Sequence, residues 1–263
     1  MLRIFGLFLF SLSILSAEIL EIKSVREVLP YADKETLVIF DVDDTLMESK
    51  LQCGRAEWYY RNVNQLIASG MGTQEAHLHF YPTWIEVQKI CPIQTVEKAT
   101  RPVIEELQKK GIRVMAMTHR HVSIKDVTLE QFRKLGIDFT VNCVHEGTLE
   151  IEAEHPTVYQ DGALFVCDFN DKGDIFLKFL KATGLKAKKI LFIDDKQHNL
   201  QTVEKVLSDW EGEYVGFFYP RADSKNFDAI IADTQFQLLL PKPLEKEDKK
   251  VRDCEKEEKP VFF

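Results

Sequence analysis

The sequence predicts an α/β fold built on a doubly wound, mostly parallel sheet, and three observations lead to it. Short apolar, β-rich runs occur at 37–41, 112–117 and 189–193, as expected for strands buried on both faces. Helical stretches separate these runs, which is typical of parallel βαβ units. Polar side chains follow each run, at the strand ends where α/β sheets bind their ligands.

The two helices that precede and follow the second of these strands have clear boundaries. Residues 101–110 read as a helix, with Pro102 in its first turn and Gly111 just beyond its end. Residues 122–135 form an amphipathic helix that Gly136 ends. The other expected elements are β-rich segments over 138–167 with a hairpin turn at Asp161-Gly162, helices at 172–183 and 199–210, a strand at 214–219 and a last helix at 226–240.

Both ends of the chain differ from the middle. Residues 1–17 combine a charged start, an apolar run and a small-residue end, which is the pattern of a secretory signal peptide. A retained N-terminal anchor is the alternative, although the run is short for a membrane span. Residues 241–263 are dense in Lys and Glu and predict a solvated, charged tail. We therefore expect an exported chain, periplasmic or secreted, with no stable membrane span once the signal is removed.

Composition limits the class of partner. The chain has 263 residues, of which 45% are hydrophobic, so it can bury a sizeable core. Its 34 Lys and Arg residues stand against 42 Asp and Glu residues, for a net charge of −8. This acidic balance argues against nucleic acid as a partner, although a local pocket can still hold a phosphate.

The five cysteines are an odd number without any Cys-x-x-Cys spacing, which disfavours a structural zinc site. An oxidising compartment permits disulfides, for example Cys53 with Cys91 or Cys143 with Cys167. Sequence cannot assign the pairing. For Cys143 and Cys167 we favour the simpler role of small buried hydrophobes.

Acidic residues gather at two of the three strand ends. Asp41 and Asp43 follow the first strand, Thr118 ends the second, and Asp194-Asp195 ends the third. Because parallel strands end at one edge of a sheet, these carboxylates would crowd together and repel one another unless a cation neutralises them. Oxygen ligands suit a hard divalent ion, and Mg²⁺ is the usual one where phosphate is bound.

The order Asp41-x-Asp43-x-Thr45, then Thr118, then Lys172, then Asp194-Asp195 resembles the haloacid dehalogenase (HAD) superfamily. The matching stretches are 37–46, 101–120 and 172–200. The signal peptide and the last of these stretches also resemble a bacterial family of exported HAD-like proteins known as a domain of unknown function, DUF2608.

This resemblance implies a domain organisation. Residues 18–240 would form a HAD-like core, and 47–99 would be a small, mainly helical cap insertion over the active site. The aromatic residues of the insertion, among them Trp58 and Trp84, would either line a substrate pocket or form the insertion's own core. We expect Pro82 to interrupt any single long helix there.

The resemblance also implies catalytic roles. Asp41 would be the nucleophile that forms an aspartyl-phosphate, and Asp43 would protonate the leaving oxygen and later activate water. Thr118 would donate its hydroxyl to a phosphoryl oxygen. Lys172 would neutralise charge on the nucleophile and the transferring group. Lys178 and Lys181 lie near Lys172 in the sequence, so the choice of lysine is itself a prediction.

The same resemblance implies the ligands of Mg²⁺. Asp41, the backbone carbonyl of Asp43 and Asp194 would bind the ion, and Asp195 would be a further ligand or hold a bound water. Asn199 would orient the acidic pair.

Two alternatives for individual residues stay open beside these roles. Arg120 would contact a substrate phosphate or pair with Asp44. The His-x-His pairs that begin at His77 and His119 favour surface or supporting roles over zinc, since no Cys or carboxylate lies at matching spacing.

Three functions remain in competition. The first is an Mg²⁺-dependent phosphohydrolase acting on phosphate monoesters of small molecules. The second is a non-catalytic, exported binding protein on the HAD fold, because fold does not decide function. The third is a phosphotransferase, which differs only in the acceptor. Asp43 favours catalysis, since binding alone needs no acid or base. Neither the substrate nor the oligomeric state can be read from the sequence.

Overall fold

The computed structural model describes residues 18–221 and 226–239, so the predicted signal peptide at 1–17 and charged tail at 241–263 lie outside the described residues. The chain divides into two compact units. Their described parts are residues 18–48 and 94–221, here called the core unit, and residues 49–93 and 226–239, here called the insertion unit.

The core unit is built on an eight-stranded sheet with the order β1-β10-β9-β2-β5-β8-β7-β6. Neighbouring strands are parallel from β1 to β8, and β7 and β6 add an antiparallel edge. This confirms the predicted α/β class with a mostly parallel sheet. The strands are β1 (Glu18–Glu21), β2 (Thr36–Phe40), β5 (Arg113–Thr118), β6 (Thr148–Glu150), β7 (Val158–Gln160), β8 (Ala163–Phe165), β9 (Lys189–Asp194) and β10 (Glu213–Phe218).

The order of these strands creates a switch point in the middle of the sheet. From β2 the chain moves outward through β5 to β8, and it then returns to β9 on the other side of β2. Connections therefore leave in opposite directions at β2 and β9, and this reversal opens a crevice beyond their carboxyl ends. All five residues of β2 are buried, as predicted for a strand covered on both faces.

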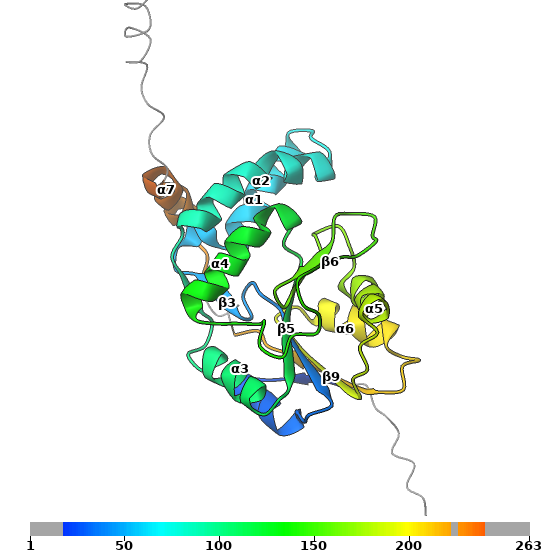
Figure 1. Cartoon of the computed structure of the whole chain (residues 1–263). Coiled ribbons are helices and arrows are strands. Elements are labelled where there is room, and N and C mark those ends of the chain that lie inside the picture. The colour runs from blue at the N-terminus through cyan, green and yellow to red at the C-terminus, as the bar shows by residue number, and fades with distance from the viewer. Residues whose placement is uncertain (1–17, 222–225, 240–263) are drawn as a thin grey trace, which may run out of the picture. The chain divides into compact units, whose positions relative to one another are not determined.

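Helices cover both faces of the sheet (Figure 1). Phe176, Phe179 and Leu200, from α5 and α6, pack in one apolar core with sheet residues such as Ile39 and Phe192. On the opposite side lie α3, which contacts β5, and α4. The helices of the core unit are α3 (Thr100–Lys109), α4 (Lys125–Leu135), α5 (Lys172–Thr183), α6 (Gln197–Val206) and the 3-10 helices η1 (Val25–Tyr31) and η3 (Val122–Ile124).

The insertion unit is helical and has a core of its own. The ring of Trp58 contacts those of Phe80, Trp84 and Phe236, and Trp58 itself is buried. Its elements are η2 (Gln52–Gly54), α1 (Ala56–Ala68), α2 (Thr73–Ile90) and α7 (Ala229–Leu239). Helix α7 thus groups with the insertion, whereas the sequence analysis assigned residues up to 240 to the core. The strands β3 (Met47–Ser49) and β4 (Ile93–Thr95) pair where the chain enters and leaves the insertion.

The expectation that Pro82 interrupts the helix is wrong, because α2 runs through it from Thr73 to Ile90. A proline inside a helix loses one hydrogen bond and costs about 3 kcal/mol. Tyr81 and Trp84, on either side of Pro82, are buried in the aromatic core, and their burial offsets that cost.

The edge strand β1 was not predicted from the sequence, whereas the turn between β7 and β8 was. Strand β1 has only two apolar residues among four, which is too weak a pattern to recognise. The hairpin turn at Asp161-Gly162 is confirmed: the two residues have φ of +49° and +81° and connect β7 to β8. Within the described part of the chain, no helix is both long enough and apolar enough to cross a membrane.

Candidate active site

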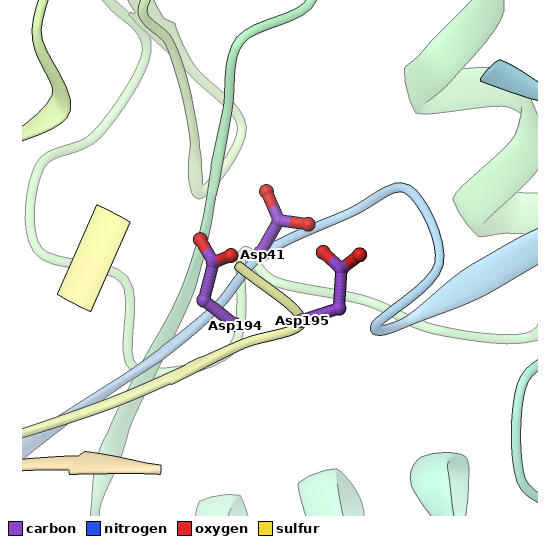
Figure 2. A group of neighbouring side chains, drawn as sticks. All are labelled: Asp41, Asp194 and Asp195. Atoms are coloured by element: carbon purple, nitrogen blue, oxygen red, sulfur yellow. The ribbon is translucent and has the colours of Figure 1, made fainter. Parts of the chain in front are cut away.

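Three carboxylates meet at the switch point of the sheet. Asp41 follows β2, Asp194 ends β9, and Asp195 comes next; Figure 2 shows their carboxyl groups projecting in the same direction. One oxygen from each lies within 4.8 Å of the other two. All three residues are buried, with at most 6% of their surface exposed. The structure therefore brings together three of the four residues predicted to bind a metal.

The ammonium group of Lys172 joins two of these carboxylates. Its Nζ donates to Asp41 Oδ1 at 2.5 Å and to Asp194 Oδ2 at 2.8 Å, and the side chain is 1% exposed. Lys178, one of the neighbouring alternatives, instead donates to the carbonyl of Glu152 at the surface. Of the nearby lysines, Lys172 is thus the one positioned for chemistry at Asp41.

Local features of the chain explain how Lys172 reaches this position. It is the first residue of α5, where the Asp171 side chain caps the helix by accepting the Asp174 N–H. Next to it, a Cβ at Gly173 would lie 2.3 Å from the carbonyl oxygen of Thr202 in α6. Glycine therefore allows the start of α5 to approach α6 closely, which brings Lys172 to the carboxyl end of β9.

The charges at this site do not balance. Three carboxylates face the buried ammonium of Lys172 and the exposed ammonium of Lys196, which leaves one formal negative charge in excess. Burial raises the pKa of Asp41 well above its usual value, against the lowering effect of Lys172. Burial and the adjacent Asp194 also raise the pKa of Asp195 to about 6. Although burial disfavours a charged lysine, Asp194 and Asp41 raise the pKa of Lys172, so its ammonium stays charged.

The hydrogen bonds of Asp194 occupy its carboxylate fully. Oδ1 accepts from the backbone N–H of Lys196 at 2.7 Å, Oδ2 accepts from Lys172, and the amide of Asn199 donates to both oxygens at 3.0 Å. A carboxylate has about four acceptor positions, and all of them are used here. Asn199 thus contacts Asp194, one member of the acidic pair, and its orienting role stays a prediction.

Asp41 and Asp195 keep acceptor positions that Asp194 lacks. Lys172 binds Oδ1 of Asp41, and Oδ2 of Asp41 accepts no hydrogen bond from any described residue. Asp195 Oδ2 lies 2.7 Å from the exposed ammonium of Lys196, in an ion pair without hydrogen-bond geometry. Carboxylate oxygens whose negative charge is not fully compensated are suitable ligands for a hard divalent cation such as Mg²⁺. Asp41, Asp194 and Asp195, three of the predicted ligands, together form a group that could hold such an ion.

Asp43 is held by a second basic residue, Arg120. The guanidinium donates to both carboxylate oxygens of Asp43, at 2.7 and 2.8 Å. On its other side it donates to Thr128 and Gln131 of α4, at 2.9 and 2.7 Å. Arg120 is buried and the side chain of Asp43 is 40% exposed. Arg120 was expected to contact a substrate phosphate or to pair with Asp44, and the bidentate ion pair that it forms is with Asp43.

Thr118 and His119 complete the edge of the site. Thr118 ends β5, the strand beside β2, and its hydroxyl oxygen accepts the Arg120 N–H at 3.1 Å. Burial, together with the charge of Lys172, lowers the pKa of His119 to about 3, so this imidazole is neutral at pH 7. The contacts of Arg120 with α4 were missed, because nothing in the spacing of Arg120, Thr128 and Gln131 indicates that they meet.

We predict that Lys172→Met lowers the free energy of unfolding by about 3–5 kcal/mol in metal-free buffer, because it leaves Asp41 and Asp194 buried without their cation. Urea unfolding followed by circular dichroism measures the change. Lys178→Met is the matched control on the same helix, and its exposed side chain should change the stability by less than about 0.5 kcal/mol. An equal decrease in the free energy of unfolding in the two variants would contradict the conclusion that Lys172 neutralises the buried carboxylates.

Comparison with solved structures finds low-level similarity to phosphatases. A phosphoserine phosphatase in a phospho-aspartyl intermediate analogue state is 16% identical, covers 71% of this chain and 88% of that chain, and has a TM-score of 0.34. The class C acid phosphatase from Bacillus anthracis with tungstate bound is 12% identical, covers 90% and 85%, and has a TM-score of 0.38. Similarity at this level says nothing about activity.

Sequence relatives are found in Chlamydia. A Chlamydia pneumoniae protein named "Putative outer membrane protein" is 30% identical over 226 residues, which are 82% of this chain and 83% of the relative. A protein of the same name from Chlamydia trachomatis is 28% identical over 208 residues, 78% of this chain and 77% of the relative. Residues 18–249 match the family described as "Protein of unknown function (DUF2608)". This match covers most of the chain and confirms the narrower resemblance seen in the sequence: the chain belongs to the DUF2608 family.

Proposed function

We propose that this protein is an Mg²⁺-dependent phosphohydrolase that cleaves phosphate monoesters through an aspartyl-phosphate on Asp41. The observation that carries the proposal is the buried bridge from Lys172 to Asp41 and Asp194. A carboxylate with one oxygen bound to an ammonium and the other unengaged is prepared for attack on phosphorus. The same ammonium lies where charge on the transferred group needs neutralisation.

In the first step, a carboxylate oxygen of Asp41 attacks the phosphorus while the bond from phosphorus to the ester oxygen breaks. The departing alcohol oxygen takes a proton from Asp43. Lys172 holds Asp41 in place through Oδ1, and the Thr118 hydroxyl, at the end of the neighbouring strand, donates to a phosphoryl oxygen. Positioning and charge stabilisation of this kind supply most of the catalysis in phosphoryl transfer.

In the second step, water attacks the phosphorus of the aspartyl-phosphate. Asp43, now a carboxylate, accepts a proton from that water, and Asp41 is released as a carboxylate. Inorganic phosphate is the product. A phosphotransferase would follow the same course with an acceptor hydroxyl in place of water.

Bound Mg²⁺ would neutralise the excess negative charge and stabilise the phosphoryl oxygens. Asp41 and Asp195 would hold it, because Asp194 has used its acceptor positions on Lys172, Asn199 and the Lys196 N–H. In this arrangement Asp194 positions Lys172 and contributes charge to the metal site without contacting the ion.

The ion pair between Asp43 and Arg120 also supports the second candidate function. The bidentate arginine binds both carboxylate oxygens of Asp43, so neither oxygen is available to a leaving group while the pair is formed. For catalysis, this pair must loosen when substrate arrives, so that Asp43 can carry the proton of the first step. If it never loosens, the same site binds a phosphorylated ligand without turning it over.

We also propose that the protein is exported. The predicted signal peptide at 1–17 supports this, and so does the name that the chlamydial relatives carry. Whether the destination is the periplasm or the medium follows from fractionation of cells.

Release of phosphate from p-nitrophenyl phosphate tests the proposal. We expect the wild-type chain to hydrolyse it only with Mg²⁺ present, and Asp41→Asn to lose at least about 10³-fold in kcat because the amide cannot act as nucleophile. An unchanged circular dichroism spectrum would show that the variant is folded. Full activity in Asp41→Asn would contradict the assignment of Asp41 as the nucleophile. A wild-type chain that is folded but inactive on a panel of phosphometabolites would favour the function of a non-catalytic binding protein.

Arg120→Lys tests whether the ion pair positions Asp43. Lysine keeps the charge but cannot bind both carboxylate oxygens or reach Thr128 and Gln131 in the same geometry. We expect kcat to fall by about 10–100-fold with KM changed by less than about twofold, since Asp43 acts in chemistry and not in binding. Arg133→Lys, at an exposed position of α4, is the matched control. Equal kcat in both variants would argue against positioning by Arg120.

Asp195→Asn tests the choice of metal ligand. Losing an anionic ligand should weaken Mg²⁺ binding by at least about tenfold, as measured by isothermal titration calorimetry. Asp209→Asn, which removes an exposed carboxylate of the same unit, should leave the affinity unchanged. Mg²⁺ affinity equal to wild type in Asp195→Asn would exclude Asp195 as a ligand.

A further inference from the structure

Two buried cysteines face each other in the insertion unit, and neither is a residue of the proposed active site. Cys53 lies in η2 and Cys91 caps the C-terminus of α2. Their sulfur atoms are 3.8 Å apart although 38 positions separate them in the sequence. Cys53 is fully buried and Cys91 is 5% exposed. Both are free thiols in this structure.

The surrounding contacts hold this pair in place. The Gln88 side chain of α2 donates to the carbonyl of Gly54 at 2.9 Å, and Gln235 of α7 accepts the Gln52 N–H at 2.7 Å. A Cβ at Gly54 would lie 2.9 Å from the sulfur of Cys91. The absence of a side chain at Gly54 is therefore what allows Cys91 to approach η2 so closely.

The geometry falls within reach of a covalent bond. A disulfide has sulfur atoms about 2.0 Å apart, so the two sulfurs must approach by about 1.8 Å, which side-chain rotations of two facing cysteines can supply. The backbone N–H of Lys50 already donates to the carbonyl of Pro92 at 2.8 Å, so the chain segments that carry the thiols are joined next to them.

We infer that Cys53 and Cys91 form a disulfide bond that closes the base of the insertion when the protein is in an oxidising compartment. The bond encloses α1 and α2 in one covalent loop. It would stabilise the insertion by restricting its unfolded state, an effect that grows with loop length. The inference is independent of the proposed phosphatase function, because it involves none of the residues at the switch point.

The oxidation needs a disulfide donor, either a small-molecule disulfide such as oxidised glutathione or a protein thiol oxidase. The thiolate of Cys91 attacks one sulfur of the donor, and the first donor thiol leaves. The thiolate of Cys53 then attacks the sulfur of Cys91, and the second donor thiol leaves. The two cysteines lose two protons and two electrons in total, and the donor disulfide is reduced to two thiols.

The order of attack follows from the environment of each thiol. Cys91 is the more exposed of the two. The hydrogen bonds of Cys91 with Cys53 and with Ser49 lower the pKa of Cys91, whereas the pairing with Cys91 and burial raise the pKa of Cys53. Cys91 therefore supplies the thiolate that meets the donor.

The test compares the full chain after equilibration in reduced and in oxidised glutathione. Free thiols are then alkylated, and non-reducing peptide mapping by mass spectrometry identifies any linked pair. We expect a Cys53–Cys91 linked peptide in the oxidised sample, loss of two of the five thiols, and a Tm higher by roughly 5–10 °C that a reductant reverses.

Cys53→Ser and Cys91→Ser should each abolish the linked peptide and the rise in Tm. Cys143→Ser and Cys167→Ser, which remove free thiols of the core unit, are the matched controls and should keep both. Alkylation of Cys53 and Cys91 in the oxidised wild type would overturn the inference, as would linkage of either one to another cysteine. The wild-type result decides the matter even if a serine variant does not fold.

Discussion

The buried ammonium of Lys172 is the interaction on which the candidate site depends. Without it, Asp41 and Asp194 would be two adjacent carboxylates in a site that excludes most water, and such a charge pair is strongly destabilising. Several features of the fold serve this contact. The order of the strand connections reverses between the parallel strands β2 and β9, α5 begins at Lys172, and Gly173 permits the close approach of α5 to α6.

The three carboxylates divide their roles according to their hydrogen bonds. Asp194 is saturated by Lys172, Asn199 and the backbone of Lys196, so it organises the site. Asp41 and Asp195 retain acceptor positions, and the site carries more negative than positive charge. A divalent cation would restore the balance, which is why charge and geometry together support metal-assisted phosphoryl chemistry at this position.

A second network connects the site to helix α4 of the core unit. Arg120 links Asp43 to Thr128 and Gln131, so a helix outside the sheet controls the orientation of the proposed acid and base. The insertion unit, by contrast, has its own aromatic core and its own thiol pair. Its aromatic residues stabilise the unit itself, which is the second of the two roles considered from the sequence.

The sequence by itself determined the α/β class and the buried strands, because a strand covered on both faces must be continuously apolar. It also determined which polar residues gather at the candidate site, because parallel strands end at one edge of the sheet. Only the tertiary structure decided which lysine reaches Asp41, which carboxylate Arg120 binds, and that α7 joins the insertion. Pro82 and β1 were misjudged for the same reason. These outcomes depend on contacts between residues far apart in the chain, and local sequence patterns do not predict such contacts.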